Sequence, residues 1–346
     1  MPKKPPLLTI ALAVALLGLA ALFLLCNSTK SSGFIDKSGK LIISIDGLED
    51  AGEFHDGLAP VLVGKGWGYI DKQGKWAIPP QFREARNFSE DLAAVRLQSG
   101  KYSFINKDAK GIIEVDANCV GDFHNGVAMI ANNGRCGYMD HSGQTIIPLM
   151  YEAPPRGSSI DAASDVVAVK DTSQNQSSPL AWKYVDLENN TIFEQGFFGA
   201  KQVSSGLAAV CMPNKENPNN PTLGKWGFID KNGNIAIPPV YDDEEPFKEG
   251  MARITIKDKS GEGKSEKFTF INQENQRLSQ EFDLANSFSD DVAVVGIKKD
   301  GELLFGYIDK SGNYIIKPRF IKANNFSEGL AFTARKALSR MPWQSY

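Results

Sequence analysis

Aspartate residues recur along this chain of 346 residues at one position of a repeated phrase, and carboxylates gathered in this way are common ligands of calcium. The residues are Asp36, Asp71, Asp140, Asp186, Asp230 and Asp309. Asn106 and Asn272 occupy the same position in two other copies, where an amide makes the same local turn bond but carries no charge. The series is therefore predicted to form turns, and no metal site is predicted.

Histidine and glycine patterns point to neither a catalytic nor a nucleotide site. His55 and His124 stand where another copy carries Ser89, which is typical of a solvated turn, and neither a His-x-x-x-His motif nor a paired carboxylate accompanies them. Residues 261–265 resemble a phosphate-binding loop, but Asp258 stands where that loop needs its first glycine. We therefore expect no enzyme activity and no cofactor.

Three cysteines, Cys119, Cys136 and Cys211, follow the N-terminal region, and disulfides persist only in an oxidising compartment. Cys119 and Cys136 are the pair predicted to form a disulfide, because they flank one strand and its turn. The alternative is that these thiols are buried in place of apolar residues, since Cys136 stands where another copy has Trp67. No histidine is placed to activate a thiol, so a catalytic cysteine is not predicted.

Composition limits the class of protein. The net charge is −3, and the only charged residues among the first 32 are Lys3, Lys4 and Lys30, so the remainder is mildly acidic. An acidic body argues against a nucleic-acid partner. The hydrophobic content of 42% is enough for a core, and 32 Gly and 18 Pro beside 20 Phe favour many short strands broken by turns.

The N-terminus has the pattern of a membrane signal. A basic stretch, Met1 to Pro6, leads into Leu7 to Leu25, which carries no charge and is about as long as a membrane-spanning helix. Cys26 resembles the acylated cysteine of a bacterial lipoprotein, although Leu25 precedes it where that signal has a small residue. Residues 1–32 are predicted to be a signal peptide or a signal anchor with a hydrophobic helix. A retained anchor, a lipoprotein and a secreted protein all place the body outside the cytoplasm.

Two phrases alternate through the rest of the chain at a period of about 40 residues, which indicates a stacked or radial repeat architecture. The first phrase occupies residues 33–39, 68–74, 137–143, 227–233 and 306–312, with weaker copies at 104–107, 184–187 and 270–273. The second phrase occupies residues 54–59, 88–93, 123–128, 247–252, 288–293 and 326–331. Residues 33–346 are therefore predicted to be one all-β domain of about eight antiparallel meander repeats.

Each copy predicts a hairpin. In Asp71-Lys72-Gln73-Gly74 the aspartate comes first and the glycine fourth, as in a type I turn, and Gly233 and Gly312 hold the same place in other copies. Prolines such as Pro79 follow the next short apolar run and end it, because proline cannot donate to a strand ladder.

The phrases resemble the WG repeat family. Trp67-Gly68 and Trp226-Gly227 carry the pair that names it, whereas Cys136 and Phe305 replace the tryptophan in other copies. The resemblance implies an exported bacterial protein with a repeat architecture and no assigned activity. The first and last pieces of the body are complementary halves of one repeat, so the array either closes into a propeller-like ring or remains an open solenoid arc.

Three copies contain insertions at the same point of the repeat, residues 171–180, 212–224 and 257–266. In a regular array they project from one face, and such insertions often mark a binding surface. The alternative is that they are tolerated surface loops. The residues predicted to contact a partner are Asn175, Asn217, Asn219, Lys225, Lys259 and Lys264.

The sequence thus predicts a non-catalytic scaffold, membrane-tethered or secreted, that binds a protein or a polymer of the cell envelope through these loops. The alternative is a ring that binds a small ligand or a carbohydrate, with aromatic residues such as Trp76 or Trp182 as stacking platforms.

Overall fold

The structure, a computed structural model, describes residues 31–154, 166–172, 180–193, 195–213, 220, 224–257 and 266–335. These residues form twenty-eight β-strands and no helix, so the described part of the chain is all-β as predicted. It contains no helix that is long and apolar enough to cross a bilayer. The predicted signal segment, including Cys26, lies outside the described residues.

Eight antiparallel sheets follow one another along the chain, and we number them from the sheet that contains the first strand. Sheet 1 is β1 (Ser31–Ile35), β2 (Leu41–Ile43), β27 (Lys322–Ala323) and β28 (Ala331–Arg335); sheet 2 is β3 (Leu48–Ala51), β4 (Leu58–Val63), β5 (Gly66–Asp71) and β6 (Trp76–Phe82); sheet 3 is β7 (Glu84–Ser89), β8 (Leu92–Arg96), β9 (Tyr102–Ile105) and β10 (Gly111–Val115); sheet 4 is β11 (Cys119–Val120), β12 (Val127–Asn132), β13 (Arg135–Asp140) and β14 (Thr145–Glu152). Sheet 5 is β15 (Val166–Lys170) and β16 (Trp182–Asp186); sheet 6 is β17 (Gly199–Ala200), β18 (Ala208–Met212), β19 (Lys225–Ile229) and β20 (Ile235–Tyr241); sheet 7 is β21 (Met251–Lys257) and β22 (Glu266–Asn272); sheet 8 is β23 (Leu284–Ala285), β24 (Val292–Lys299), β25 (Glu302–Asp309) and β26 (Tyr314–Phe320).

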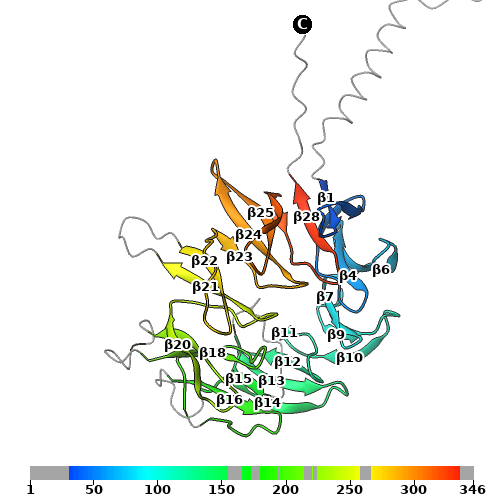
Figure 1. Cartoon of the computed structure of the whole chain (residues 1–346). Coiled ribbons are helices and arrows are strands. Elements are labelled where there is room, and N and C mark those ends of the chain that lie inside the picture. The colour runs from blue at the N-terminus through cyan, green and yellow to red at the C-terminus, as the bar shows by residue number, and fades with distance from the viewer. Residues whose placement is uncertain are drawn as a thin grey trace, which may run out of the picture.

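The sheets are arranged as a propeller-like ring with six four-stranded blades and two two-stranded sheets (Figure 1). Isolated bridges extend the two smaller sheets, for example Trp182 with Phe197 in sheet 5 and Phe268 with Phe282 in sheet 7. Every sheet is a meander of neighbouring antiparallel strands, which is the predicted repeat unit. The repeats therefore form blades that stand side by side around the ring.

The ring closes because the first and last described strands pair. Phe34 of β1 lies opposite Phe332 of β28, and the ladder runs from Ser31 with Arg335 to Ile35 with Ala331. Both strands lie next to one another in Figure 1. This pairing decides between the two architectures that the sequence left open, and it removes an open strand edge at each end of the array.

The hydrophobic core lies between neighbouring sheets. Tyr69 of sheet 2 is fully buried and meets Phe88 of sheet 3 edge to face, with ring centroids 4.9 Å apart. The same contact recurs for Phe104 with Phe123 at 4.8 Å, and for Tyr307 with Phe326 at 4.7 Å. The aromatic residues of the two repeated phrases thus pack against one another across these junctions.

The glycine of the WG pair is required by a close backbone approach. A Cβ atom on Gly68 would lie 2.5 Å from the carbonyl oxygen of Ile78, and one on Gly137 would lie 2.2 Å from that of Ile147. The pairing of β5 with β6 shifts register at this point, next to Pro79 and Pro80, and the fourth strand bulges over the third. Any side chain at Gly68 would push the two strands apart.

Candidate functional site

The two ends of each sheet form two faces of the ring. We call turn face the end that carries the turns between first and second strands and between third and fourth strands, such as residues 52–57 and 71–75 of sheet 2. We call hairpin face the end that carries the hairpin between second and third strands, such as Gly64-Lys65 of sheet 2. Antiparallel strands reverse direction at each connection, so these sets of connections lie at opposite ends.

The carboxylates of the repeated aspartates on the turn face accept hydrogen bonds from the backbone of their own turns. Asp71 Oδ1 accepts hydrogen bonds from the backbone N–H of Gln73 and of Lys75, both at 2.9 Å. Asp36, Asp140, Asp230 and Asp309 bond the backbone two and four residues later in the same way. Gly74, Gly233 and Gly312 have φ of 78°, 82° and 86°, which favours glycine.

Asn106 makes the same bonds to Asp108 and Lys110, so the turn function needs no charge. The described residues contain no group of three His, Cys, Asp or Glu side chains arranged to hold a metal. The geometry therefore accounts for the aspartate series as turn chemistry, as predicted.

The second repeated phrase links several neighbouring sheets through hydrogen bonds. The carboxylate of Glu90 accepts a hydrogen bond from the N–H of Gly126 at 3.0 Å, and that of Glu328 accepts one from the N–H of Gly57 at 3.2 Å. Hydroxyls of the same phrase donate to the next sheet, as Ser327 does to the carbonyl of Phe54 at 2.5 Å. These bonds join turns of neighbouring sheets. The polar groups that make them on the turn face therefore hold sheets together.

The three insertions leave from and return to strand ends at the hairpin face of three consecutive sheets. They connect β15 to β16, β18 to β19 and β21 to β22, whereas the hairpins of sheets 2, 4 and 8 have two-residue loops. Figure 1 shows these strands in adjoining sectors of the ring. The long hairpins are therefore neighbours and are not scattered around the ring.

Only one of the predicted contact residues is described. Lys225 is the first residue of β19, and its ammonium group donates to the carboxylate of Asp242 in the same sheet. Asn175, Asn217, Asn219, Lys259 and Lys264 lie outside the described residues. The structure thus gives the strand ends from which the insertions leave, all on one face. Contact of the insertions with a partner remains a prediction.

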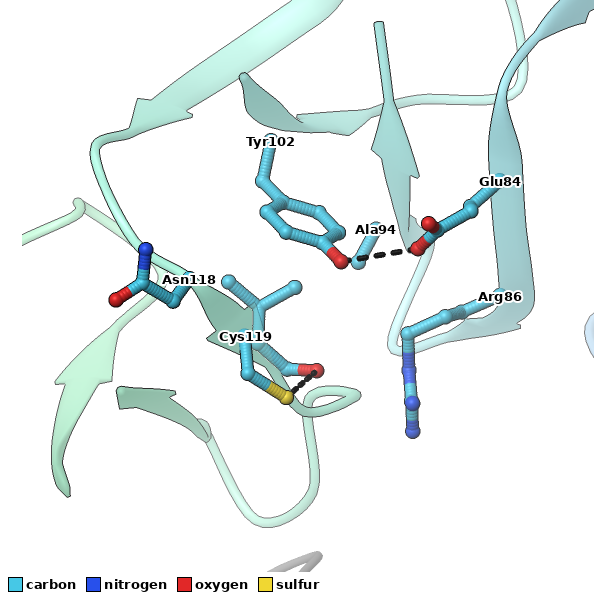
Figure 2. Close-up of a pocket in the computed structure, with 7 residues that line it drawn as sticks. Glu84, Arg86, Ala94, Tyr102, Asn118 and Cys119 are labelled. Carbon is cyan, nitrogen blue, oxygen red and sulfur yellow. Dashed lines mark hydrogen bonds between the residues drawn. The ribbon is translucent and has the colours of Figure 1, made fainter. Parts of the chain in front are cut away.

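A cavity of about 260 Å³ also opens on the hairpin face, between sheets 3 and 4 (Figure 2). Its lining residues are Glu84, Arg86, Ala94, Tyr102, Asn118, Cys119 and Val120. The Tyr102 hydroxyl donates to Glu84 at 2.9 Å, and burial together with Glu84 raises the pKa of Tyr102. Arg86 forms a two-pronged ion pair with Asp122 at 2.6 and 3.0 Å. The cavity carries both signs of charge beside apolar walls, and the packing of sheet 3 against sheet 4 brings these residues together.

The structure corrects the predicted Cys119–Cys136 disulfide. Cys119, Cys136 and Cys211 are free thiols, and Cys119 and Cys136 lie on either side of Ala131, in β11 and β13. Strands two apart in a sheet are separated by about 10 Å, whereas a disulfide needs Cα atoms within about 7 Å. Burial raises the pKa of Cys136 and of Cys211 to about 11, so both thiols stay protonated at neutral pH.

A buried carboxylate at the junction of sheets 6 and 7 was not singled out from the sequence. Glu244 has no exposed surface, and neither of its carboxylate oxygens accepts a hydrogen bond within the described residues. Lys201 of sheet 6 donates to the Glu244 carbonyl oxygen and lies 3.5 Å from its Oε1. Burial raises the pKa of Glu244 to about 8 although Lys201 opposes that shift.

Comparison of the repeats would have revealed Glu244. It stands three residues before Phe247, and the same position before the other phenylalanines holds Ala51, Ala85, Val120, Ala285 and Ala323. Glu244 is the one charged residue at a repeat position that otherwise holds small apolar residues in these copies, and this difference is visible in the sequence.

The tryptophans proposed as stacking platforms are not brought together. Trp76 is 39% exposed on β6, the outer strand of sheet 2, and Trp182 is half-buried on β16 of sheet 5. Neither of them lines the described cavity between sheets 3 and 4.

Comparison with known proteins agrees with this architecture. The family model described as "WG containing repeat" matches residues 33–66, 67–102, 226–259 and 305–333. The intervening copies depart from the pattern, as at Cys136 and Asn106, yet sheets 3 and 4 keep the four-stranded topology. No curated protein matches the sequence.

Among solved structures, one titled as a crystal structure of the eukaryotic initiation factor is similar with a TM-score of 0.50 and 10% identity, covering 90% of this chain and 100% of that chain. The crystal structure of BamB from Moraxella catarrhalis has a TM-score of 0.45 and 10% identity, with 90% and 99% covered. At these identities the similarity concerns the fold alone.

Proposed function

Because the chain carries WG containing repeats and closes into a propeller-like ring, we propose that it is a non-catalytic scaffold that binds a protein or a polymer of the cell envelope through the hairpin face of sheets 5, 6 and 7. The observation that carries this proposal is the position of the three long hairpins on one face of three consecutive sheets. Loops that project together from a rigid framework form one adaptable surface.

The described strands next to the three insertions are held by ion pairs. Lys183 of β16 pairs with Asp171, which follows β15, at 2.7 Å, and Lys267 of β22 pairs at 2.6 Å with Asp283, which precedes β23 of sheet 8. Ordered strand ends lower the entropy that a partner must remove on binding. The proposal assigns no catalytic residue and no cofactor to the chain.

The proposed location is outside a bacterial cytoplasm, at the membrane, with residues 1–32 as the signal anchor and lipidation of Cys26 or secretion as alternatives. Ser31 begins β1 at the hairpin-face end of sheet 1, opposite Arg335. Cys26 to Lys30 span at most about 18 Å in an extended chain. An anchor at Leu7 to Leu25 would therefore hold the hairpin face as the face nearest the bilayer, which favours a partner at the membrane surface.

Affinity capture after crosslinking in cells tests this function. The full chain is compared with a variant in which all three long hairpins are shortened to two residues, after circular dichroism shows that both fold. The matched control changes the hairpins of sheets 2 and 3 through Lys65→Ala and Lys101→Ala. We expect one envelope component to be retained by the full chain and the control and lost by the shortened variant. Retention of every partner by the shortened variant would refute the proposal.

A second candidate, binding of a small ligand or a carbohydrate, is favoured by the cavity between sheets 3 and 4. The Cys119 thiol lines that cavity, so an occupant should slow its alkylation. The test measures alkylation of Cys119 across a panel of sugars and envelope glycans, with Cys119→Ser as the reagent control. An unchanged rate across the panel would remove this candidate.

A further inference from the structure

The junction between sheets 6 and 7 contains an acid that packing alone does not explain. At this position five other copies carry alanine or valine, and Glu244 is fully buried there without a hydrogen-bond donor to either carboxylate oxygen. The hydroxyl of Thr255, in the neighbouring strand β21, is also buried without a partner among the described residues. Uncompensated buried polar groups destabilise a junction unless they serve another purpose.

The groups around Glu244 come from both sheets and from sheet 5. Lys201 is the nearest cation, at 3.5 Å from Oε1, and its ammonium also lies 4.0 Å from Asp243, 3.7 Å from Glu245 and 5.2 Å from the Trp226 ring. The phenol of Tyr184 in β16 and the thiol of Cys211 in β18 also interact electrostatically with Glu244. Arg253 of β21 is engaged by Glu245 at 2.8 Å. One lysine therefore faces three carboxylates.

The segment that carries Glu244 is weakly attached to its own sheet. In six sheets the first strand forms a ladder of at least two residues, but in sheet 7 a single bridge joins Glu244 to Ile254. The two backbone bonds that make this bridge run from Glu245 N–H to the Arg253 carbonyl at 2.8 Å and from Thr255 N–H to the Asp243 carbonyl at 3.0 Å. Segments with so few backbone bonds are the ones that open locally.

We propose that Glu244 is a proton-controlled latch that keeps residues 243–245 seated between sheets 6 and 7. While its carboxyl is protonated the segment stays closed. When the proton is lost to solvent, the buried anion has Lys201 at 3.5 Å as its nearest cation, a lysine shared with two other carboxylates, and opening of the segment lets the anion reach water. The segment links β20 to β21, and along the chain it lies between the strand pairs β18–β19 and β21–β22 that carry the long hairpins of sheets 6 and 7. The part of this inference that concerns regulation of partner binding rests on the proposed function.

The direction of the pH effect follows from linkage. Burial raises the pKa of Glu244 to about 8 in the closed state, whereas a carboxyl exposed by opening titrates near its ordinary value of 4.5. Protonation therefore favours the closed state, and closure weakens as pH rises between these two values. Over that range the opening equilibrium increases by up to about tenfold per pH unit, and it levels off above the closed-state pKa.

Hydrogen exchange of the full chain, corrected for intrinsic exchange rates, tests the latch without a partner. We expect protection of the Glu245 and Thr255 amides to fall between pH 5 and 8 in the wild type and to stay flat in Glu244→Gln, which cannot ionise. The amide of Asn286, which makes the corresponding bond in sheet 8, and the nearby amide of Asp283, which bonds the Gly296 carbonyl, serve as internal controls and should stay flat in both. Equal pH dependence in Glu244→Gln, or no dependence in the wild type, would overturn the proposal.

Two further measurements keep the test decisive. If Glu244→Gln does not fold, the Glu244→Ala variant restores the residue type of the other sheets, and a carbon-13 titration of wild-type Glu244 with a midpoint below 5 would refute the latch. Partner retention is then measured against pH for wild type and Glu244→Gln. If residues 243–245 open with pH but retention of the partner does not change with pH, only the regulatory part of the proposal is refuted. If the shortened-hairpin variant retains every partner, the proposed function is refuted and the hydrogen-exchange result still stands.

Discussion

Phe34, three residues from the start of the described chain, lies opposite Phe332, three residues from its end, and their rings meet edge to face with centroids 5.9 Å apart. Both side chains are buried in one cluster with Phe54 of sheet 2. The contact that closes the ring is therefore part of the hydrophobic core.

This relationship predicts the cost of truncating Phe332. Phe332→Ala removes a ring packed at the closure and should lower the free energy of unfolding by about 3–5 kcal/mol, the usual cost of a buried Phe→Ala change. Chemical denaturation measures the loss. Leu41→Ala, at a side chain that is 46% exposed on neighbouring β2, is the control and should cost far less. Equal effects of the two changes would show that closure does not stabilise the ring.

The glycine of the WG pair should be intolerant of any side chain. Gly68→Ala places a Cβ atom 2.5 Å from a backbone oxygen, and relief of that overlap should cost about 1–3 kcal/mol of stability. Gly111→Ala is the matched control, because its Cβ would meet only the Ser103 hydroxyl at 3.2 Å. Thermal unfolding of both variants checks the prediction, which fails if Gly68→Ala melts with the wild type.

The turn aspartates should accept asparagine but not alanine. Asp71→Asn keeps the acceptor that bonds Gln73 and Lys75, and Asn106 already does this in sheet 3. Asp71→Ala leaves two N–H groups without that acceptor and should cost about 1 kcal/mol. Denaturation with and without calcium is the measurement, and stabilisation of the wild type by calcium would contradict the turn interpretation.

The Glu244 carboxyl should make global stability depend on pH with a defined sign. Because the folded-state pKa is raised to about 8, the wild type is favoured relative to Glu244→Ala at low pH and loses that advantage as pH rises from about 4.5 to about 8. The difference in melting temperature between Glu244→Ala and the wild type should therefore shift in favour of the variant over this range. A difference that is constant from pH 5 to 8 would show that Glu244 is ionised throughout.

The three described cysteines should differ in reactivity. Burial raises the pKa of Cys136 and Cys211 to about 11, whereas Cys119 is half-buried at the cavity between sheets 3 and 4. Alkylation of the native protein at pH 8, located by mass spectrometry, should modify Cys119 first. A disulfide-linked Cys119–Cys136 peptide from the oxidised protein would contradict the separation of β11 and β13.

The repeat, its turns and the all-β class were determined by the sequence alone, because these features depend on residues close together in the chain. The Asp71 side chain bonds an N–H only two residues away, and the aromatic phrase around Tyr69 marks a strand wherever it recurs. Even the common position of the three insertions within the repeat was visible from spacing.

Only the tertiary structure decided the relationships between distant residues. Ring closure depends on Ser31 meeting Arg335, and the spacing of Cys119 and Cys136 along the chain did not show that β12 separates them. The burial of Glu244 beside Lys201 likewise arises where two sheets pack. A local pattern specifies the backbone of each sheet, whereas the angle and order in which sheets pack determine which side chains lose water, and it is that loss that creates the cavity and the buried acid.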